Sequence, residues 1–204
     1  MKYKAVIWDF DGVWSKDKFY KTVERDYPKI RDFIQNYIWG ESGENRVERW
    51  MRAELNMNEI NKLISENTGI DFELLTEKFL NDVNKMKIEM GHVAIINKLK
   101  KQNVKVALVT NNMEIFTSIT RPRLKFDELF ENKVFNSFDY KMLKDEGLFD
   151  LALKEMGNLN YADVILIDDS PRARIFFELK GGQSYAYNNF ENFKIWAENN
   201  LLNK

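Results

Sequence analysis

Two pairs of aspartates follow short apolar runs, and carboxylates placed in this way can bind a metal ion or act as nucleophile, acid and base. Asp9 and Asp11 end the first run, in VIWDFDGVW, and Asp168 and Asp169 end a later one, in VILIDDSP. Carboxylates gathered at one place repel one another unless a cation lies among them, and a ligand set made only of oxygen suits magnesium. We therefore predict that these four aspartates form a site for Mg²⁺.

Two further clusters carry groups that suit a phosphate. Thr110 and Asn111 follow an apolar run in VALVTNN and offer a hydroxyl and backbone N–H groups, and Lys141 and Lys144 follow another run. A hydroxyl, main-chain donors and a lysine at one rim are what the oxygens of a phosphoryl group require. Each cluster alone can be explained as a turn, as a helix cap or by a lysine on the surface. Their joint occurrence favours chemistry on a phosphate.

Five apolar runs that end in polar residues have the length and composition of strands. Helical periodicity lies between the later ones, as in Gly91–Gln102 and Leu148–Met156. This alternation predicts an α/β fold with a Rossmann-like, three-layer core and a parallel five-stranded sheet, whose carboxyl-end rim would gather the polar clusters. The predicted strands are Tyr3–Asp9, Val104–Thr110, Lys133–Ser137, Val164–Asp168 and Ser184–Tyr187.

Residues 15–90 interrupt this alternation, because they contain helical stretches and no convincing strand. Turns are expected at Trp39–Gly43 and Asn67–Asp71, where glycine lies among polar residues. We predict an all-helical insertion after the first strand, with a core domain of residues 1–14 and 91–204 and a helical domain of residues 15–90. The predicted helical stretches are Tyr20–Trp39, Val47–Leu55, Met57–Glu66 and Phe72–Met86.

The composition disfavours several other classes of protein. Lys and Arg number 31 against 32 Asp and Glu, so no overall field attracts nucleic acid or an anionic membrane, and no apolar run reaches the ~20 residues of a spanning helix. The absence of cysteine excludes disulfides and thiolate catalysis, and the single histidine, His92, is interpreted as a helix-start residue. We expect a cytoplasmic protein that binds neither nucleic acid nor membranes. Its oligomeric state stays open.

These motifs resemble those of the haloacid dehalogenase superfamily, in the same order along the chain. Its first motif, D-x-D-G-[TV] after an apolar strand, matches at Asp9, Asp11 and Gly12; its second matches at Thr110 and Asn111, and its fourth at the acidic pair in VILIDDSP. The third motif, a lysine usually followed by proline and an acidic residue, departs from the pattern because the proline is missing. Counting from Ser137 favours Lys144, with Lys141 as the alternative.

The resemblance implies a Mg²⁺-dependent phosphatase that works through an aspartyl phosphate. Asp9 would be the nucleophile, and Asp11 would act as acid and then as base. Thr110, Asn111 and Lys144 would hold the transferring oxygens, with Thr110 and Lys144 counted among the catalytic residues. Asp9, the backbone carbonyl of Asp11 and Asp168 would hold the metal, and Asp169 would orient its ligand shell.

The helical insertion would be a cap that closes over a small phosphorylated metabolite. Arg46, Arg49 and Arg52, with Trp50, could clamp an anionic or aromatic leaving group, but a solvated helix face with Trp50 packed inside is the preferred interpretation.

Several other functions are compatible with parts of the pattern. A phosphomutase of the same superfamily and a non-catalytic module that binds phosphate or a partner stay as alternatives. Dehalogenases of the superfamily lack an acid at the position of Asp11, which disfavours carbon–halogen hydrolysis. Two-component receiver domains also combine acidic residues, a Thr and a Lys, but their acidic pair follows the first strand, whereas here it comes late.

Overall fold

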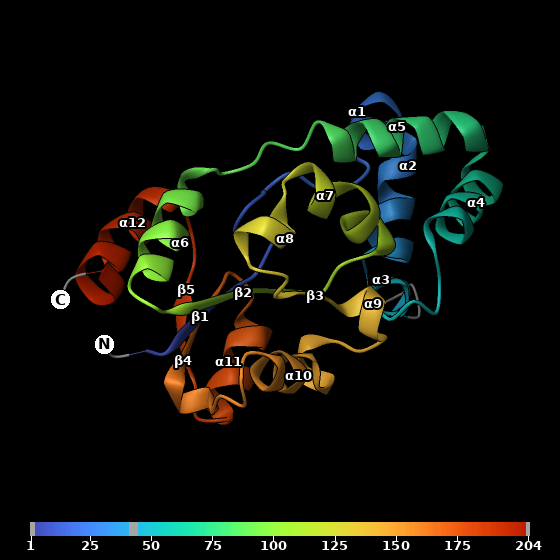
Figure 1. The fold of residues 1–204 in the computed structure, drawn as a ribbon. Helices are drawn as coiled ribbons and strands as arrows, with labels where there is room; N and C mark the ends of the chain where they lie inside the picture. The colour runs from blue at the N-terminus through green and yellow to red at the C-terminus, as the bar shows by residue number, and fades with distance from the viewer. Residues whose placement is uncertain (1–2, 41–44, 203–204) are drawn as a thin grey trace.

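The strands form one parallel sheet at the centre of the molecule (Figure 1). A computed structural model describes residues 3–40 and 45–202. In it five strands lie in the order β3-β2-β1-β4-β5, and every neighbouring pair is parallel. The α/β, Rossmann-like fold is thus confirmed, with small differences in the strand bounds. The strands are β1 (Ala5–Trp8), β2 (Lys105–Thr110), β3 (Val134–Asn136), β4 (Val164–Asp168) and β5 (Gln183–Ala186).

Both faces of the sheet are apolar, because side chains alternate between the two faces along each strand. In β1, Val6 and Trp8 belong to the larger hydrophobic cluster, whereas Ala5 and Ile7 belong to the smaller one. The central strands β2 and β4 alternate between the same two clusters. Burial on both faces holds these strands in place, and therefore also the polar residues that follow them.

Helices cover the two faces of the sheet. The helices α6 (Gly91–Lys101) and α12 (Phe190–Ala197) pack on one face, and α10 (Leu148–Glu155) and α11 (Pro171–Leu179) pack on the other (Figure 1). The shorter elements of the core are α7 (Arg121–Arg123), α8 (Phe126–Leu129), α9 (Ser137–Tyr140), the π-helical segments Phe116–Thr120 and Glu198–Leu202, and the 3₁₀ turns Lys144–Glu146 and Tyr161–Asp163.

The segment between β1 and α6 is helical, as the sequence predicts. The single stretch Tyr20–Trp39 is divided, however, because Tyr27 leaves the helical region (φ −129°, ψ 72°). A residue that precedes proline is disfavoured in the α conformation, and Pro28 begins the next helix. The inserted elements are α1 (Lys21–Asp26), α2 (Pro28–Phe33), the π-helical segment Ile34–Ile38, α3 (Arg46–Met51), α4 (Met57–Thr68) and α5 (Phe72–Asn84).

Local signals end and begin the two longest inserted helices. Asn56 and Glu59 form a reciprocal capping box at the start of α4, and Gly69 ends it with φ 74°. Asp71 then accepts from the backbone N–H of Leu74 and caps α5. The turn predicted at Asn67–Asp71 is therefore present. Most of the turn predicted at Trp39–Gly43 lies outside the described residues.

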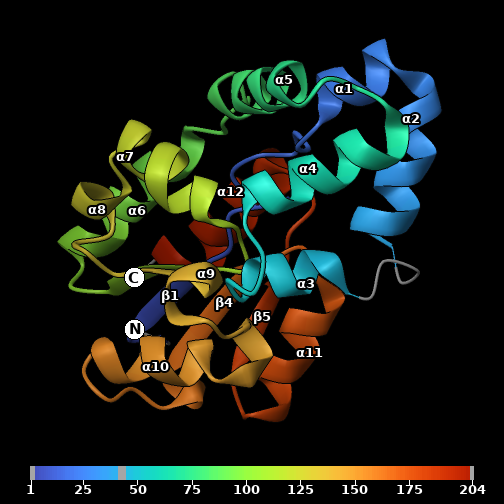
Figure 2. The ribbon, with the colours of Figure 1, turned by 90° about the vertical axis from the view of Figure 1, so that its right-hand side faces the viewer.

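The inserted helices share an aromatic interior. Trp39 lies between Phe19 and Trp50, with near-parallel rings and centroids 6.3 and 6.5 Å away, and Phe79 packs against Phe19 at 5.6 Å. These side chains belong to the same hydrophobic cluster as one face of the sheet. Figure 2 shows α3 and α4 on the side of the molecule where the strands end. The insertion is therefore packed against the rim at which the predicted site residues should meet.

No helix in residues 3–40 and 45–202 combines the length and apolar character that a membrane span requires.

Candidate active site

The end of β1 is held in register by its neighbour β4. The backbone N–H of Asp9 donates to the carbonyl of Ile167 at 2.9 Å, and the Asp9 side chain is 8% exposed. Phe10 packs into the interior, with ring centroids 5.0 Å from Phe116 and 6.0 Å from Phe126. Asp9 and Asp11 thus flank an anchored aromatic residue, as expected from the alternation of side chains along an extended segment.

Gly12 allows two loops of the rim to meet. Its φ of 73° lies in the left-handed region that favours glycine. A Cβ atom at this position would lie 2.0 Å from Oδ2 of Asp169. Any other residue here would have to displace the Asp169 carboxylate and adopt an unfavourable backbone conformation, so glycine is favoured at this position.

Lys144 connects the ends of β1 and β4. Its Nζ lies 2.7 Å from Oδ1 of Asp9 and 2.8 Å from Oδ2 of Asp168, and all three side chains are buried. The second oxygen of Asp168 accepts from the backbone N–H of Ser170 at 2.8 Å. Lys141, the alternative lysine, is exposed at the end of α9. The structure thus brings Lys144, and not Lys141, to the carboxylates.

The rim carries more negative charge than Lys144 can balance. One carboxylate oxygen from each of Asp9, Asp168 and Asp169 lies within 4.8 Å of the others. Burial raises the pKa of Asp9 well above its ordinary value, and the nearby Asp168 raises it further. Burial and Asp168 likewise raise the pKa of Asp169. The raised pKa values mean that the ionised carboxylates are disfavoured without a nearby positive charge. A cluster of this kind, with oxygen ligands only, fits a hard divalent cation such as Mg²⁺.

The Asp11 side chain is not part of the cluster of Asp9, Asp168 and Asp169, and it has a hydrogen-bond partner of its own. Nδ2 of Asn112 donates to Oδ2 of Asp11 at 2.9 Å. Burial raises the pKa of Asp11 to about 7; Lys144 opposes the rise and Asp169 adds to it. Asp11 can therefore hold a proton near neutral pH, as a general acid must.

Asn112 itself is held firmly, and the sequence does not single out its side chain. It is buried, its backbone N–H donates to Oγ of Ser137 at 3.0 Å, and its Oδ1 accepts from the N–H of Met113. The fixed Oδ1 turns Nδ2 toward Asp11. The second asparagine of the Thr-Asn-Asn stretch was the available signal, but a pairing between positions 101 residues apart cannot be read from one sequence.

Thr110 and Asn111 lie at the end of β2, where the sequence places them. Thr110 is fully buried, and its hydroxyl has no hydrogen-bond partner among the described residues. A buried hydroxyl without a partner destabilises the folded state unless a ligand forms a hydrogen bond with it. Oδ1 of Asn111 accepts from the backbone N–H of Lys144 at 2.8 Å. The side chain of Asn111 thus orders the loop that carries Lys144.

A cavity of about 540 Å³ opens beside these groups, between the core and the insertion. Asp11, Gly12, Met113 and Asp169 line it from the core. Tyr187 and Asn188 also line it from the core. The inserted segment contributes Ser15, Lys16, Asp17, Lys18, Phe19, Gln35, Trp39, Val47 and Met51. The volume is within the range of sites that bind small molecules.

The basic cluster of α3 does not line this cavity. Trp50 is fully buried, and its Nε1 donates to Glu114 at 2.6 Å, so the packed interpretation holds. Arg49 pairs with Glu54 at 3.2 Å, and Arg52 pairs with Glu146 at 2.5 Å.

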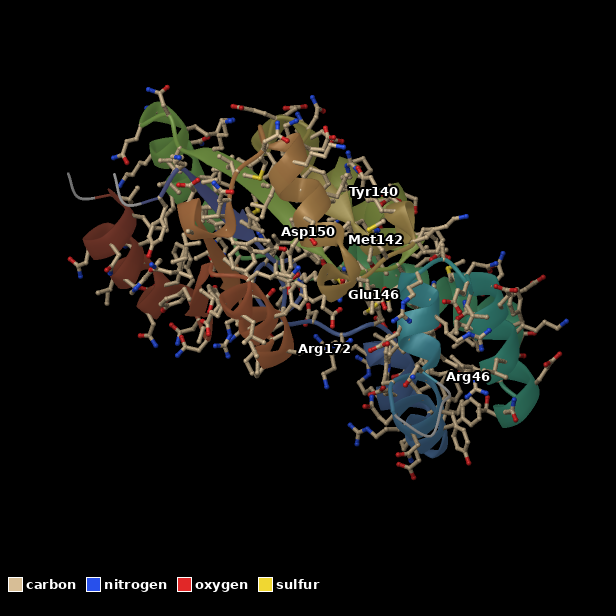
Figure 3. The ribbon with its side chains drawn as sticks, turned by 90° about the horizontal axis from the view of Figure 1, so that it is seen from below. Arg46, Tyr140, Met142, Glu146, Asp150 and Arg172 are labelled. Atoms are coloured by element: carbon tan, nitrogen blue, oxygen red, sulfur yellow. The ribbon has the colours of Figure 1, made fainter. Side chains whose placement is uncertain are left out.

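A salt-bridge network joins the insertion to the core. Glu48 of α3 accepts from both Arg52 and Arg172, and Arg172 also reaches Asp145, 2.7 Å away. Figure 3 shows Glu146 and Arg172 where the core meets the inserted helices. The arginine at position 52 therefore attaches α3 to the turn that contains Lys144, instead of facing a ligand.

The sequence matches one family model over most of its length. The model is described as a haloacid dehalogenase-like hydrolase, and it matches residues 3–175. No protein with a curated description matches the sequence.

Solved structures match the fold at low sequence identity. A structure described as a HAD-like family hydrolase from Porphyromonas gingivalis has a TM-score of 0.71 and 16% identity, with 100% of both chains covered. A HAD family enzyme from Bacteroides thetaiotaomicron, in complex with magnesium and inorganic phosphate, has a TM-score of 0.62 and 16% identity over 94% of this chain and 98% of that one. The L-2-haloacid dehalogenase from Xanthobacter autotrophicus with chloropropionic acid covalently bound has a TM-score of 0.64 and 14% identity, over 99% of this chain and 85% of that one.

Proposed function

The chain belongs to the haloacid dehalogenase-like hydrolases, and we propose that it is a Mg²⁺-dependent phosphatase that hydrolyses a small phosphorylated metabolite through an aspartyl phosphate. The observation that carries this proposal is a second carboxyl group, that of Asp11, beside the buried cluster of Asp9, Lys144 and Asp168. A phosphate ester needs a proton for its departing oxygen, whereas a halide ion leaves without one.

Asp9 is the proposed nucleophile. One of its carboxylate oxygens attacks phosphorus, the bond between phosphorus and the ester oxygen breaks, and an acyl phosphate forms on the side chain. Lys144 lies 2.7 Å from Asp9 and keeps its proton: burial by itself would lower the pKa of this lysine, but Asp168 and Asp9 raise it above its ordinary value. A permanent ammonium at this position favours the anionic form of Asp9 and attracts the phosphoryl oxygens.

Asp11 is the proposed acid and base. In the first step it gives its proton to the departing ester oxygen, so that the alcohol leaves neutral. In the second step it takes a proton from the water that attacks phosphorus, which releases inorganic phosphate and regenerates Asp9. A pKa of about 7 suits both directions of transfer, and the amide of Asn112 fixes the Oδ2 atom of Asp11.

The remaining predicted residues bind the phosphoryl group or the metal in this proposal. The unpartnered hydroxyl of Thr110 and the backbone N–H of Asn111 would donate to phosphoryl oxygens. Asp9, the backbone carbonyl of Asp11 and Asp168 would hold Mg²⁺, with Asp169 orienting its shell. When bound, the ion supplies positive charge that reduces the repulsion between a carboxylate and a phosphate dianion.

The proposal extends to the organisation of the chain. Residues 1–14 and 91–204 would form the catalytic core domain, and residues 15–90 a helical cap domain that covers the cavity. An enclosed site favours a metabolite over a folded phosphoprotein. A cytoplasmic location, compatible with a cysteine-free sequence, is part of the same proposal.

Release of inorganic phosphate from a panel of small esters tests the proposal. Sugar phosphates, nucleotides, phosphoglycolate and an aryl phosphate are supplied with Mg²⁺ or with EDTA, and 2-chloropropionate is tested for chloride release. We expect Mg²⁺-dependent phosphate release that falls at least about 10³-fold in Asp9→Asn and about 10²-fold or more in Asp11→Asn. Lys141→Met is the matched control and should retain activity.

Three results would contradict the phosphatase assignment. Chloride release without phosphate release would favour a dehalogenase. An isomerised phosphate ester in place of free phosphate would favour a phosphomutase. Phosphate release by the wild-type protein that is no faster than release without protein, across the panel, would favour a binding module without turnover.

A further inference from the structure

One part of the cavity lining is apolar. Phe19, Trp39, Val47 and Met51 contribute it, and Met113 continues it on the side of the core. Its aromatic part is packed, because the Trp39 ring is near-parallel to the rings of Phe19 and the buried Trp50, with centroids 6.3 and 6.5 Å away. A molecule that occupies this cavity beside Asp11 and Asp169 therefore also meets this apolar wall.

Several polar side chains that also line the cavity already make a hydrogen bond within the protein. Oγ of Ser15 accepts from the N–H of Asp17, whose carboxylate accepts from Lys21 and from the N–H of Lys87. Gln35 donates to Glu24 at 2.5 Å, and Lys16 donates to the carbonyl of Asn188 at 2.6 Å.

The same holds at the end of β5, on the core side of the cavity. Oδ1 of Asn188 accepts from Asn192 at 3.2 Å, and the hydroxyl of Tyr187 lies 3.2 Å from Nε2 of His92. Among the polar side chains of the lining beyond the aspartates, Lys18 has no partner in the described part of the chain, and it is exposed. The hydrogen-bonding groups of the lining that stay free are therefore mainly those of exposed side chains, Lys16, Lys18 and Asn188, whereas the apolar residues form its packed part.

These contacts discriminate between two kinds of phosphate ester. A leaving group rich in hydroxyls would give up hydrogen bonds to water where it meets the apolar wall, and each group left unpaired there weakens binding by roughly tenfold or more. A flat apolar group has no hydrogen bonds to water to lose. Its binding also removes apolar surface from water, both its own and that of Phe19 and Trp39.

The geometry points to a substrate that is a phosphomonoester with an aromatic or otherwise apolar leaving group, and not a sugar phosphate. This inference rests on the proposed phosphatase function and specifies its substrate class. The apolar wall selects the leaving group, while Asp9, Asp11 and Lys144 act on the phosphate that all candidate substrates share. Val47 and Met51 are thus specificity-determining residues whose replacement should change selectivity more than turnover chemistry.

A comparison of esters with similar leaving oxygens tests this assignment. Benzyl phosphate and 2-naphthylmethyl phosphate are compared with glucose 6-phosphate and glycerol 3-phosphate, because all four release a primary alcohol. Binding to Asp9→Asn is measured by titration calorimetry with Mg²⁺, and phosphate release is measured separately with the wild-type protein. We expect the two aromatic esters to bind at least about tenfold more tightly than the two polar ones.

Variants of nearly unchanged volume locate the origin of this preference. Val47→Thr and Met51→Gln place polar atoms on the wall and should each reduce the aromatic preference about threefold to tenfold. Ile175→Thr makes a comparable change at an exposed position of α11, 56% exposed, and should leave the preference unchanged.

The two readouts separate this inference from the function on which it rests. Tighter binding of glucose 6-phosphate or glycerol 3-phosphate, or a preference that Val47→Thr and Met51→Gln leave intact, would overturn the substrate class. Aromatic esters that bind with the expected preference but release no phosphate from the wild-type protein would retain the binding preference and overturn the phosphatase.

Discussion

Two groups of salt bridges lie within a few residues of each other in the sequence and differ in their surroundings. Lys144 contacts Asp9 and Asp168 in the interior, where the three side chains are at most 8% exposed. Glu146, two positions later, contacts Arg52 across the junction with the insertion, where its side chain is 38% exposed. Salt bridges between a basic and an acidic side chain therefore occur in two settings: the Lys144 pairs are shielded from water, and the Arg52–Glu146 pair is partly exposed to it.

The surroundings decide what each group can do. In the buried cluster charge is not balanced, the pKa of Asp9 and of Asp11 is raised, and the site can bind a cation or transfer a proton. In the junction network charges alternate, and hydrogen bonds from Arg52 lower the pKa of Glu146 to about 2. We conclude that the buried group is suited to chemistry and the junction network to holding α3 against the core.

The largest effect is expected where a buried charge loses its partner. Lys144→Met leaves Asp9 and Asp168 facing each other, which should lower the free energy of unfolding without Mg²⁺ by about 3–5 kcal/mol and reduce activity about 10²-fold or more. Urea unfolding with and without Mg²⁺ measures the first effect. Because Mg²⁺ can replace the lost positive charge, it should stabilise this variant more than it stabilises the wild-type protein.

Lys141→Met is the matched control for this variant, since Lys141 is exposed. Equal losses of stability and activity in the two lysine variants would remove the distinction between buried and exposed charge.

His92 extends the comparison to a buried group without a charged partner. It is fully buried, its Nε2 lies 3.3 Å from the carbonyl of Val13, and burial lowers its pKa to about 4 in spite of that carbonyl. The unfolded chain takes up a proton below pH ~6.5 and the folded protein does not, so this residue makes stability fall as the pH drops from about 6.5 to 4. The loss should approach about 3 kcal/mol.

His92→Gln removes this titration and retains a hydrogen-bonding side chain. Urea unfolding at a series of pH values should show a smaller loss between pH 6.5 and 4 in the variant than in the wild-type protein. Identical slopes in the two proteins would mean that the imidazole titrates alike in the folded and unfolded states.

The third prediction concerns the amide that fixes Asp11. Asn112→Ala frees the carboxyl group to turn away from the departing oxygen, so kcat should fall about 10-fold to 10²-fold for alkyl phosphates. An aryl phosphate such as 4-nitrophenyl phosphate needs little proton donation, so its kcat should fall much less. The ratio of the two kcat values measures this difference.

Asn199→Ala serves as a control for loss of an exposed asparagine, because Asn199 lies in the helical segment Glu198–Leu202, where alanine is accepted. A loss in Asn112→Ala that is equal for both classes of ester would contradict a positioning role and indicate a general structural defect.

The smallest effect is expected in the junction network. Glu146→Gln removes a partly exposed pair and should lower the free energy of unfolding by about 1 kcal/mol or less, and less still in high salt. Urea unfolding at low and high salt measures both quantities. A loss as large as that of Lys144→Met would show that the junction network is as essential as the buried cluster.

The sequence was sufficient for the core of the fold. Alternating apolar residues before Asp9 and Asp168 predict strands that are buried on both faces, and the structure contains them. Parallel strands end at one rim, so these aspartates and Thr110 were expected to meet there, and the structure places them at that rim. The sequence analysis does not predict the break at Tyr27, because the helical periodicity of apolar residues continues through Pro28. The break arises from the backbone, since a residue that precedes proline is disfavoured in the α conformation.

Short-range sequence patterns are thus sufficient for the set of strands, their direction and the residues that follow them, because these features depend on residues within a few positions of one another. The tertiary structure alone decided the partners: Asn112 with Asp11, Glu146 with Arg52, and the apolar wall that Val47 and Met51 contribute to the cavity. Such contacts join positions far apart in the chain, and they arise only when helices pack at particular distances and angles.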